Sequence, residues 1–379
     1  MSKKKKRSTP AAAPAEPVKA EHTQPEEPAV SSTARWMGAL CYLSILILIP
    51  ACTKWRQDEF VRFHLNQGLM VLMLATICAA LGFVPVLEQV ALSLTLLVDV
   101  LSLVGLITAL RRRKIRTYVV SAIFRRNSVF FRPYGGMWRQ ALESFDVMFV
   151  QNEESKKLLA TLGFDNVLVA GDTRFDRVAE IARAARRIDV IDRFKGDNRL
   201  FVAGSTWEPD EELLIRLIND NPDVKFVVAP HEMDESRIAR LMAETKGGAL
   251  RYTQCTPRTT YGSRQLLILD TVGILASVYG YATWSYIGGG FGVGIHNTLE
   301  AATFGLPVAF GPNYEKFKEA RDLVTLGAAR SVTDYEQLRT WFVPLRDNEE
   351  FLQKTSRIAK DYTTRHQGAT GIIVKTIFH

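Results

Sequence analysis

The sequence predicts an α/β fold with a parallel sheet in its C-terminal half, preceded by a region of membrane-spanning helices. Short apolar runs alternate with helical stretches after residue 196, and this alternation predicts the sheet. Glycine-rich or polar segments directly follow several of these runs, as expected where a parallel sheet binds a ligand. Long uncharged runs before residue 110 predict the membrane region.

Residues 1–35 are predicted to be a disordered tail. They begin with a basic cluster at residues 3–7 and continue with Ala, Pro, Glu and Thr, with almost no large apolar residue. Such a composition cannot bury enough surface to fold. The tail lacks the apolar core and cleavage site of a signal peptide.

Residues 36–110 are strongly apolar and are predicted to form the membrane region. Residues 67–87 carry no formal charge and residues 89–110 carry only Asp99, so each run is long enough to cross a bilayer. Residues 36–53 are a third, shorter candidate. Buried core helices of a soluble domain are the weaker alternative. Basic residues 111–114 and the basic tail both predict a cytoplasmic side, which requires an even number of crossings, so we expect residues 36–53 to be re-entrant or interfacial.

In the C-terminal half, five apolar runs rich in β-branched or aromatic residues are predicted strands. Helical stretches such as residues 211–219 and 233–244 lie between them. Gly204, Ser205, Thr206 and His231 follow two of these strands, at the edge where parallel sheets bind ligands. A lone histidine after a strand is more often structural, so both readings of His231 stay open. The predicted strands are residues 199–204, 225–230, 266–269, 284–287 and 307–310.

The most informative segment is the glycine-rich block of residues 288–314, which follows a predicted strand. It predicts a turn that lets backbone N–H groups approach a ligand, then a helix opening at His296 whose N-terminus favours an anion. The block does not match the dinucleotide fingerprint, because Val293 stands where the third glycine is needed. In such a helix His296 and Glu300 share one face. The alternative is an ordinary strand-to-helix turn with a capping Asn297.

Six segments, in order, resemble the 3-deoxy-D-manno-octulosonic acid (Kdo) transferases, which move Kdo from CMP-Kdo to a lipid A precursor. The resemblance covers about residues 110–379 and implies a GT-B glycosyltransferase with two Rossmann-like domains. It further implies that Asn297 and Glu300 hold the phosphate and ribose of the donor. The matching segments are residues 117–136, 149–159, 169–178, 202–212, 227–232 and 288–320.

The resemblance sets the expected domains and site residues. Residues 111–195 correspond to a truncated remnant of the N-terminal acceptor domain, and residues 196–379 to a complete C-terminal domain that binds CMP-Kdo. Asn313 and Lys316 are possible cleft residues, with a turn and a solvated helix as the alternative. The candidate donor-binding residues are Gly204, Ser205, Thr206, His231, Gly288, Gly289, Gly290, Gly292, Gly294, His296, Asn297 and Glu300.

One part of the family pattern is missing. Kdo transferases carry their catalytic base, a Glu in a glycine-Glu-Phe type motif, well before the matched part, and this chain has no such motif. Asp172 is one of the remaining acids; Asp176 is expected to cap the helix that follows it, and Glu153 and Glu154 fit a first helical turn. The alternative function is therefore a non-catalytic membrane protein whose C-terminal domain binds nucleotide sugar or is vestigial.

Composition sets the remaining expectations. The net charge of +8 suits anionic lipids, whereas no nucleic-acid recognition module is evident. The four cysteines and six histidines are scattered, so we expect no metal site, no disulfide framework and no cofactor besides the donor substrate. Residues 60–69 resemble Tic20-like small multi-span proteins. The expected partners are CMP-Kdo, a lipid A precursor and inner-membrane lipids, with the C-terminal domain on the cytoplasmic side of the bacterial inner membrane.

Overall fold

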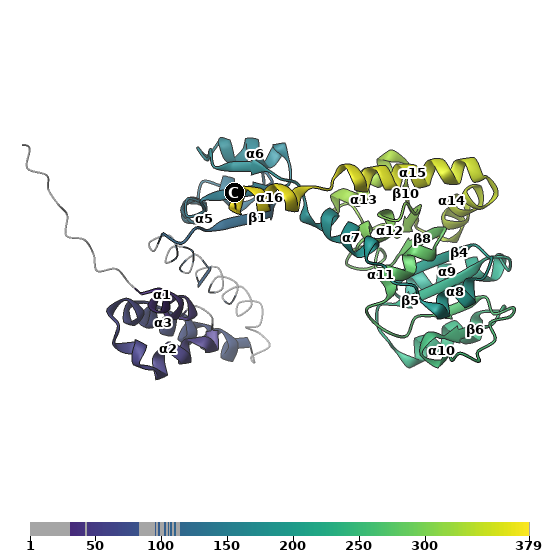
Figure 1. Cartoon of the computed structure of the whole chain (residues 1–379), viewed down its shortest axis with the longest axis horizontal. Helices are drawn as coiled ribbons and strands as arrows, with labels where there is room; N and C mark the ends of the chain where they lie inside the picture. The colour runs from purple at the N-terminus through teal and green to yellow at the C-terminus, as the bar shows by residue number, and fades with distance from the viewer. Residues whose placement is uncertain are drawn as a thin grey trace, which may run out of the picture. The chain divides into compact units, whose positions relative to one another are not determined.

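The structure of the chain is a computed structural model (Figure 1). The structure describes residues 31–41, 44–82 and 114–378, together with seven separate helical positions between residues 95 and 110. It divides into two compact units, Met1–Thr117 and Tyr118–His379. The predicted tail, residues 1–35, lies almost wholly outside the described residues.

The first unit is helical in its described part. The predicted membrane candidate at residues 36–53 is not one continuous helix but is divided among α1, η1 and α2. The longest helix, α3, begins after Asp58, whose carboxylate accepts the N–H of Val61 (3.0 Å). The elements are α1 (Ser32–Leu40), η1 (Ser44–Ile47), α2 (Leu48–Cys52), η2 (Lys54–Gln57) and α3 (Glu59–Gly82).

Within the described residues, α3 alone contains a stretch long and apolar enough to cross a membrane. That stretch is Glu59–Ile77, with a mean hydropathy of 1.3, and only 22% of it is buried. It therefore begins eight residues before the predicted span at residues 67–87. Core helices of soluble proteins and signal sequences also reach this length and hydropathy, so the helix by itself does not establish a membrane span. The second predicted span, residues 89–110, falls mostly outside the described residues.

The second unit opens with a small parallel sheet of order β1-β2-β3. Apolar side chains of η4, α5 and α6 cover one face, and the C-terminal helix α16 (Ala369–Phe378) returns to place Ile373 on the other, against Phe149. The other elements are β1 (Tyr118–Ala122), η4 (Val129–Phe131), α5 (Gly136–Leu142), β2 (Val147–Val150), α6 (Glu153–Ala160) and β3 (Val167–Val169).

Asp176 caps the start of α16, and not the start of its own helix as the sequence predicted. Its two carboxylate oxygens accept the N–H groups of Gly368 (2.6 Å) and Thr370 (2.7 Å) at the start of α16. The cap of its own helix, α7 (Thr173–Arg183), is Asp172, which accepts the N–H of Arg174 (2.9 Å). The expectation that Asp176 caps the following helix was therefore wrong, whereas Glu153 and Glu154 do lie in the first turn of α6.

The predicted parallel sheet of the C-terminal half is confirmed and has seven strands in the order β10-β9-β8-β4-β5-β7-β6. Its five predicted strands are all present, and the structure adds the short edge strands β6 and β10. The strands are β4 (Leu200–Thr206), β5 (Lys225–Pro230), β6 (Ala249–Arg251), β7 (Leu266–Ile268), β8 (Trp284–Ile287), β9 (Val308–Phe310) and β10 (Ala329–Ser331).

Helices bury both faces of this sheet, as the unbroken apolar runs of its strands require. One face packs against α9, α10 and α14, and the other against α7, α8, α12, α13 and α15. The helices are α8 (Asp189–Lys195), α9 (Glu208–Asp220), α10 (Glu235–Glu244), α11 (Leu275–Val278), α12 (Leu299–Ala302), α13 (Lys318–Leu326), α14 (Tyr335–Asp347) and α15 (Glu349–Arg365).

The strand order locates the candidate site. From β4 the chain first builds β5, β6 and β7 on one side, and then returns to build β8, β9 and β10 on the other. The connections after β4 and after β8 therefore leave in opposite directions. A crevice opens at the carboxyl ends of two such neighbouring strands, where open α/β sheets bind ligands.

Candidate functional site

The end of β4 is locally strained. Ser205 has a φ of +55°, a left-handed conformation that serine rarely adopts, and it interrupts the register between Gly204 and Thr206. Gly204 is buried against Tyr279, because a Cβ there would lie 2.1 Å from the Tyr279 hydroxyl oxygen. Gly204 therefore makes room for a packed tyrosine, while Ser205 is the partly exposed residue at this strand end.

Thr206 lies beneath the crevice surface and belongs to a buried ion-pair network. Its hydroxyl donates to a carboxylate oxygen of Glu211 (2.9 Å), and its carbonyl accepts from Arg237 (3.0 Å). Arg237 and Glu211 form an ion pair (2.6 Å) in which both side chains are largely buried. Of the predicted residues Gly204, Ser205 and Thr206 at the end of β4, Thr206 is thus the one whose side chain is buried and hydrogen-bonded within the protein.

Asp210 joins the end of β4 to the glycine-rich loop. The buried carboxylate accepts the backbone N–H of Trp207 (2.9 Å), the N–H of Gly289 (3.0 Å) and the hydroxyl of Tyr286 (2.7 Å). Burial raises the pKa of Asp210, while these hydrogen bonds oppose the rise. One carboxylate therefore fixes the turn before α9 and the loop after β8 together.

The glycines of the loop serve mainly to bring backbone segments together. A Cβ on Gly288 would lie 2.1 Å from the Ser205 carbonyl oxygen, and one on Gly290 would lie 2.6 Å from Gly311. The loop's N–H groups are largely used within the protein: Gly292 and Gly294, for example, both donate to the Gly289 carbonyl. Among the five predicted glycines, only Gly292 is exposed.

Asn297 and Glu300 lie together, although the helix begins later than predicted. α12 starts at Leu299, so His296 precedes it, and the predicted helix opening at His296 was wrong. Asn297 accepts the N–H of Leu299 (3.1 Å) and donates its amide N–H to Glu300 (3.0 Å). Burial raises the pKa of Glu300, with the Asn297 hydrogen bond opposing it. Asn297, which precedes the N-cap residue Thr298, thus orients the neighbouring carboxylate.

Three aromatic side chains from three strand ends meet in the crevice. The His231 ring, after β5, packs against both the Trp207 ring (4.7 Å between centroids) and the His296 ring (4.5 Å). The Trp207 indole N–H donates to Nε2 of His296 (3.3 Å). Burial, with a smaller contribution from His231, lowers the pKa of His296. Both predicted histidines are therefore in one cluster, which the sequence did not indicate.

Asn313 and Lys316 fix the glycine-rich loop from the β9 side. The Asn313 amide donates to the Gly292 carbonyl (2.7 Å), and its backbone N–H donates to the Gly290 carbonyl (2.8 Å). The Lys316 ammonium donates to the Val293 carbonyl. These two predicted cleft residues therefore border the loop, and both have hydrogen bonds to its backbone.

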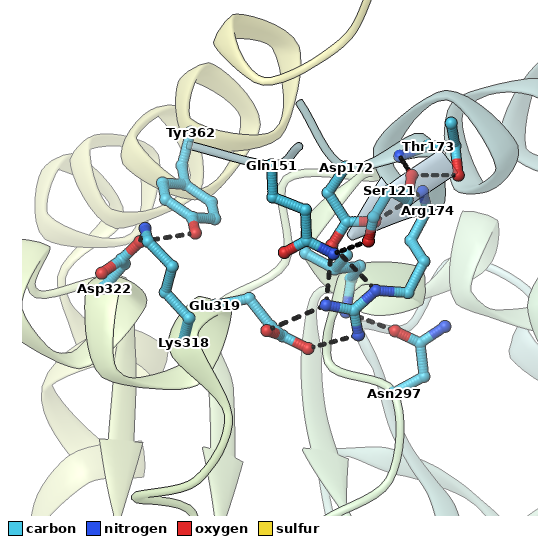
Figure 2. Close-up of polar contacts among 11 residues, drawn as sticks. Ser121, Gln151, Asp172, Thr173, Arg174, Asn297, Lys318, Glu319, Asp322 and Tyr362 are labelled. Carbon is cyan, nitrogen blue, oxygen red and sulfur yellow. Dashed lines mark hydrogen bonds and ion pairs between the residues drawn. The ribbon is translucent and has the colours of Figure 1, made fainter. Parts of the chain in front are cut away.

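A second polar cluster joins α7 to α13 (Figure 2). The Arg174 guanidinium bridges Asp172 and the buried Glu319, with N–O distances of 2.8 Å to each. Ser121, whose φ is +54°, accepts the N–H of Thr173 (3.1 Å) through its hydroxyl. A cavity of about 290 Å³ adjoins this cluster. Asp172, considered above among the remaining acids, is thus held in an ion pair.

Sequence reasoning did not identify Trp207, Asp210, Arg174 or Glu319. All four lie in segments that carried the family resemblance, so their positions gave a signal, but most of their partners are distant in sequence. A larger hollow of about 680 Å³ lies elsewhere, lined by Arg177, Arg187, Tyr252 and Ile274 among others, and includes none of the predicted site residues.

The chain is similar in sequence to known Kdo transferases, in agreement with the resemblance of its segments. Residues 86–177 match the family model of 3-deoxy-D-manno-octulosonic-acid transferase (Kdo transferase). The match begins 24 residues before the boundary at residue 110 that we expected, at the end of the predicted span at residues 67–87. The chain is 26% identical over 282 residues to the 3-deoxy-D-manno-octulosonic acid transferase of Bordetella pertussis, covering 70% of this chain and 64% of the relative.

A transferase of the same name from Rickettsia bellii is 25% identical over 234 residues, covering 60% of this chain and 54% of the relative. The chain thus spans less than two-thirds of the length of these relatives. A solved UDP-N-acetylglucosamine 2-epimerase aligns with 92% of this chain and 94% of its own, with a TM-score of 0.50 and 15% identity, and so shows the fold alone. The predicted GT-B class of α/β fold is confirmed, and the chain is a relative of the 3-deoxy-D-manno-octulosonic acid transferases.

Proposed function

We propose that the chain binds CMP-Kdo at the carboxyl edge of β4 and β8 and transfers Kdo to a lipid A precursor in lipopolysaccharide core synthesis. The observation that carries the donor site is the placement of Ser205, at the end of β4, and of His296 and the Asn297–Glu300 pair, after β8, where the strand order reverses. The curated relatives named 3-deoxy-D-manno-octulosonic acid transferase support the choice of sugar.

The chemistry matches the side chains available. The Glu300 carboxylate can accept hydrogen bonds from ribose hydroxyls, and Asn297 holds it in place. The phosphate of the nucleotide sugar can accept from His296. In the transfer, an acceptor hydroxyl attacks C2 of Kdo, the C2–O bond to the phosphate breaks, and CMP leaves while the hydroxyl proton goes to a base. No resident metal or cofactor is required in this scheme.

Donor binding without transfer is the second candidate. The acids that sequence analysis named near the cleft are engaged in structural roles: Asp172 pairs with Arg174, and Asp176 caps α16. Glu153 and Glu154 are exposed in the first turn of α6. A carboxylate that is fixed by a guanidinium or by two backbone N–H groups is poorly placed to accept a proton from an acceptor hydroxyl.

We further propose that the chain acts at the inner face of a bacterial inner membrane. The apolar surface of α3 supports this placement, because Met70 and Met73 expose 65% and 62% of their surface. The basic residues that precede the second unit suit anionic lipid headgroups. A lipid A precursor carries its phosphates at that same surface, which suits a membrane-bound acceptor.

The test is Kdo transfer by the detergent-solubilised full-length chain, with CMP binding measured in parallel by calorimetry. Glu300→Ala is the matched variant, and Glu336→Ala, an exposed glutamate on α14, is the control. Product that disappears only with Glu300→Ala supports transfer. CMP binding that Glu300→Ala weakens, without product, supports donor binding alone. Absence of CMP binding in the unmodified protein contradicts both.

A further inference from the structure

Trp207 is in direct contact with a predicted donor-site histidine. Its indole N–H donates to Nε2 of His296 (3.3 Å), and its ring lies 4.7 Å from that of His231. The backbone N–H of Trp207 is itself held by the buried Asp210 carboxylate (2.9 Å). Asp210 therefore holds the backbone at Trp207, and the indole is held by its contacts with His231 and His296.

The glycine-rich loop determines which edge of the imidazole faces the protein. Gly289 has a φ of +89°, and a Cβ there would lie 2.9 Å from Cδ2 and 3.2 Å from Nε2 of His296. The Cδ2–Nε2 edge thus faces Gly289 and Trp207, and Nδ1 lies on the opposite side of the ring. Within the described part of the chain, no acceptor is recorded for Nδ1.

A nitrogen that accepts a hydrogen bond from an indole cannot carry a proton. The neutral imidazole of His296 therefore has its proton on Nδ1, because one ring nitrogen must donate when the other accepts. The low pKa of His296, caused by burial and by the stacked His231, agrees with a neutral ring. The ionisable groups on the elements around the ring are His231, Asp210, Arg237, Glu300 and Lys316.

We propose that Trp207 is a positioning residue of the donor site, which holds His296 in the tautomer that donates from Nδ1 to an anionic group of a nucleotide sugar. In the other tautomer, Nδ1 presents a lone pair, which repels a phosphate or carboxylate oxygen. The ligand in this inference rests on the proposed function, whereas the tautomer is a property of the free protein. The two parts can therefore fail separately.

The first experiment reads the tautomer directly. Nitrogen-15 spectra of the histidine rings are recorded for the full-length protein and for Trp207→Phe, which keeps an aromatic ring against His231 but removes the N–H. His296→Gln assigns the resonances, and Trp341→Phe, on α14 against the apolar core, is the control. We expect a pyridine-type Nε2 and a pyrrole-type Nδ1 at His296, and a mixture of tautomers in Trp207→Phe alone. Unchanged His296 nitrogen shifts in Trp207→Phe would overturn the proposal.

The second experiment measures CMP affinity of both proteins between pH 5.5 and 8. The phosphate of CMP titrates equally in both, so only the ratio of the two dissociation constants is interpreted. At pH 8 we expect Trp207→Phe to bind about tenfold more weakly, the effect of losing one hydrogen bond to a charged group. As the pH falls, protonation lets the freed imidazole donate from both nitrogens, so the ratio decreases toward one.

A purely structural role for Trp207 predicts a different result. A loosened crevice weakens CMP binding by the same factor at every pH, so a pH-independent ratio would overturn the proposal. Absence of CMP binding in the unmodified protein would overturn the proposed function, and the ring spectra would then decide the tautomer alone.

Discussion

Asp210→Ala should be the most damaging single substitution in the donor crevice. It removes an acceptor from three donors at once: the N–H groups of Trp207 and Gly289 and the hydroxyl of Tyr286. Each buried donor left unpaired costs about 1–3 kcal/mol, and the hydroxyl of Tyr286 can rotate to reduce its share. We therefore expect a loss of about 3 kcal/mol in the free energy of unfolding.

The loss is large compared with the total stability of a domain, which is about 5–15 kcal/mol. It corresponds to a fall of about 6–12 °C in the midpoint of thermal unfolding for a unit of this size. Differential scanning fluorimetry of the full-length chain measures it, with the exposed carboxylate Asp197 changed to Ala as the control. A surface change of that kind should stay within about 0.5 kcal/mol.

The same substitution should weaken CMP binding, because the carboxylate connects the turn before α9 to the glycine-rich loop. Asp210→Asn separates charge from geometry: both backbone N–H groups donate to one carboxylate oxygen, so the amide oxygen can replace it while the amide N–H faces the Tyr286 hydroxyl. Its effect should therefore be intermediate. If Asp210→Ala unfolds at the same temperature as Asp197→Ala, the three hydrogen bonds do not fix the loop and the reasoning is refuted.

Three further substitutions test other parts of the second unit. Gly204→Ala places a Cβ 2.1 Å from the Tyr279 hydroxyl oxygen and should cost about 1–3 kcal/mol by thermal unfolding. Tyr279→Phe removes that oxygen but leaves Leu275 Cδ2 2.9 Å from the Cβ, so it should restore part of the loss, and no recovery would contradict the clash. Arg174→Met leaves the buried Glu319 without its cation and should cost about 2 kcal/mol, part of which Glu319→Gln should restore; a double variant no more stable than Arg174→Met would contradict this. Burial alone would raise the pKa of Asp176, but hydrogen bonds from two backbone N–H groups stabilise the charged carboxylate and lower it. The contribution of Asp176 to the stability of the fold is therefore present above the unfolded pKa and is lost as pH falls through the lower folded pKa. Asp176→Asn should therefore flatten the acid side of the stability–pH profile, and an unchanged profile would exclude this role.

The sheet of the second unit could be predicted because its signals are local. Residues 199–204, 225–230 and 284–287 are unbroken apolar runs, and strands buried on both faces need no polar alternation. The short edge strands β6 and β10 were missed, because three residues at an edge carry little pattern. The start of α12 was misplaced by three residues, because His296 and Asn297 are compatible with a helix and only the loop geometry excludes them.

The contacts that define the site could not be predicted, since each joins residues far apart in sequence. Asp176 has the spacing of a cap for its own helix, yet its partners are the N–H groups that begin α16. Arg174 pairs with Glu319, 145 residues later. No local propensity contains such information, whereas the family resemblance indicated the segments without indicating their partners.

The glycine-rich loop changes how anion recognition by this chain is understood. Sequence patterns of this kind are usually taken to mean that backbone N–H groups surround a phosphate. Here Gly288, Gly289 and Gly290 are buried because neighbouring backbone occupies the space a Cβ would need, and the N–H groups of Gly288 and Gly289 are bonded to Gly204 and Asp210. The loop therefore acts as a close-packed support. Recognition of a charged ligand is then left to the side chains that this support holds in the crevice, above all His296 and the Asn297–Glu300 pair.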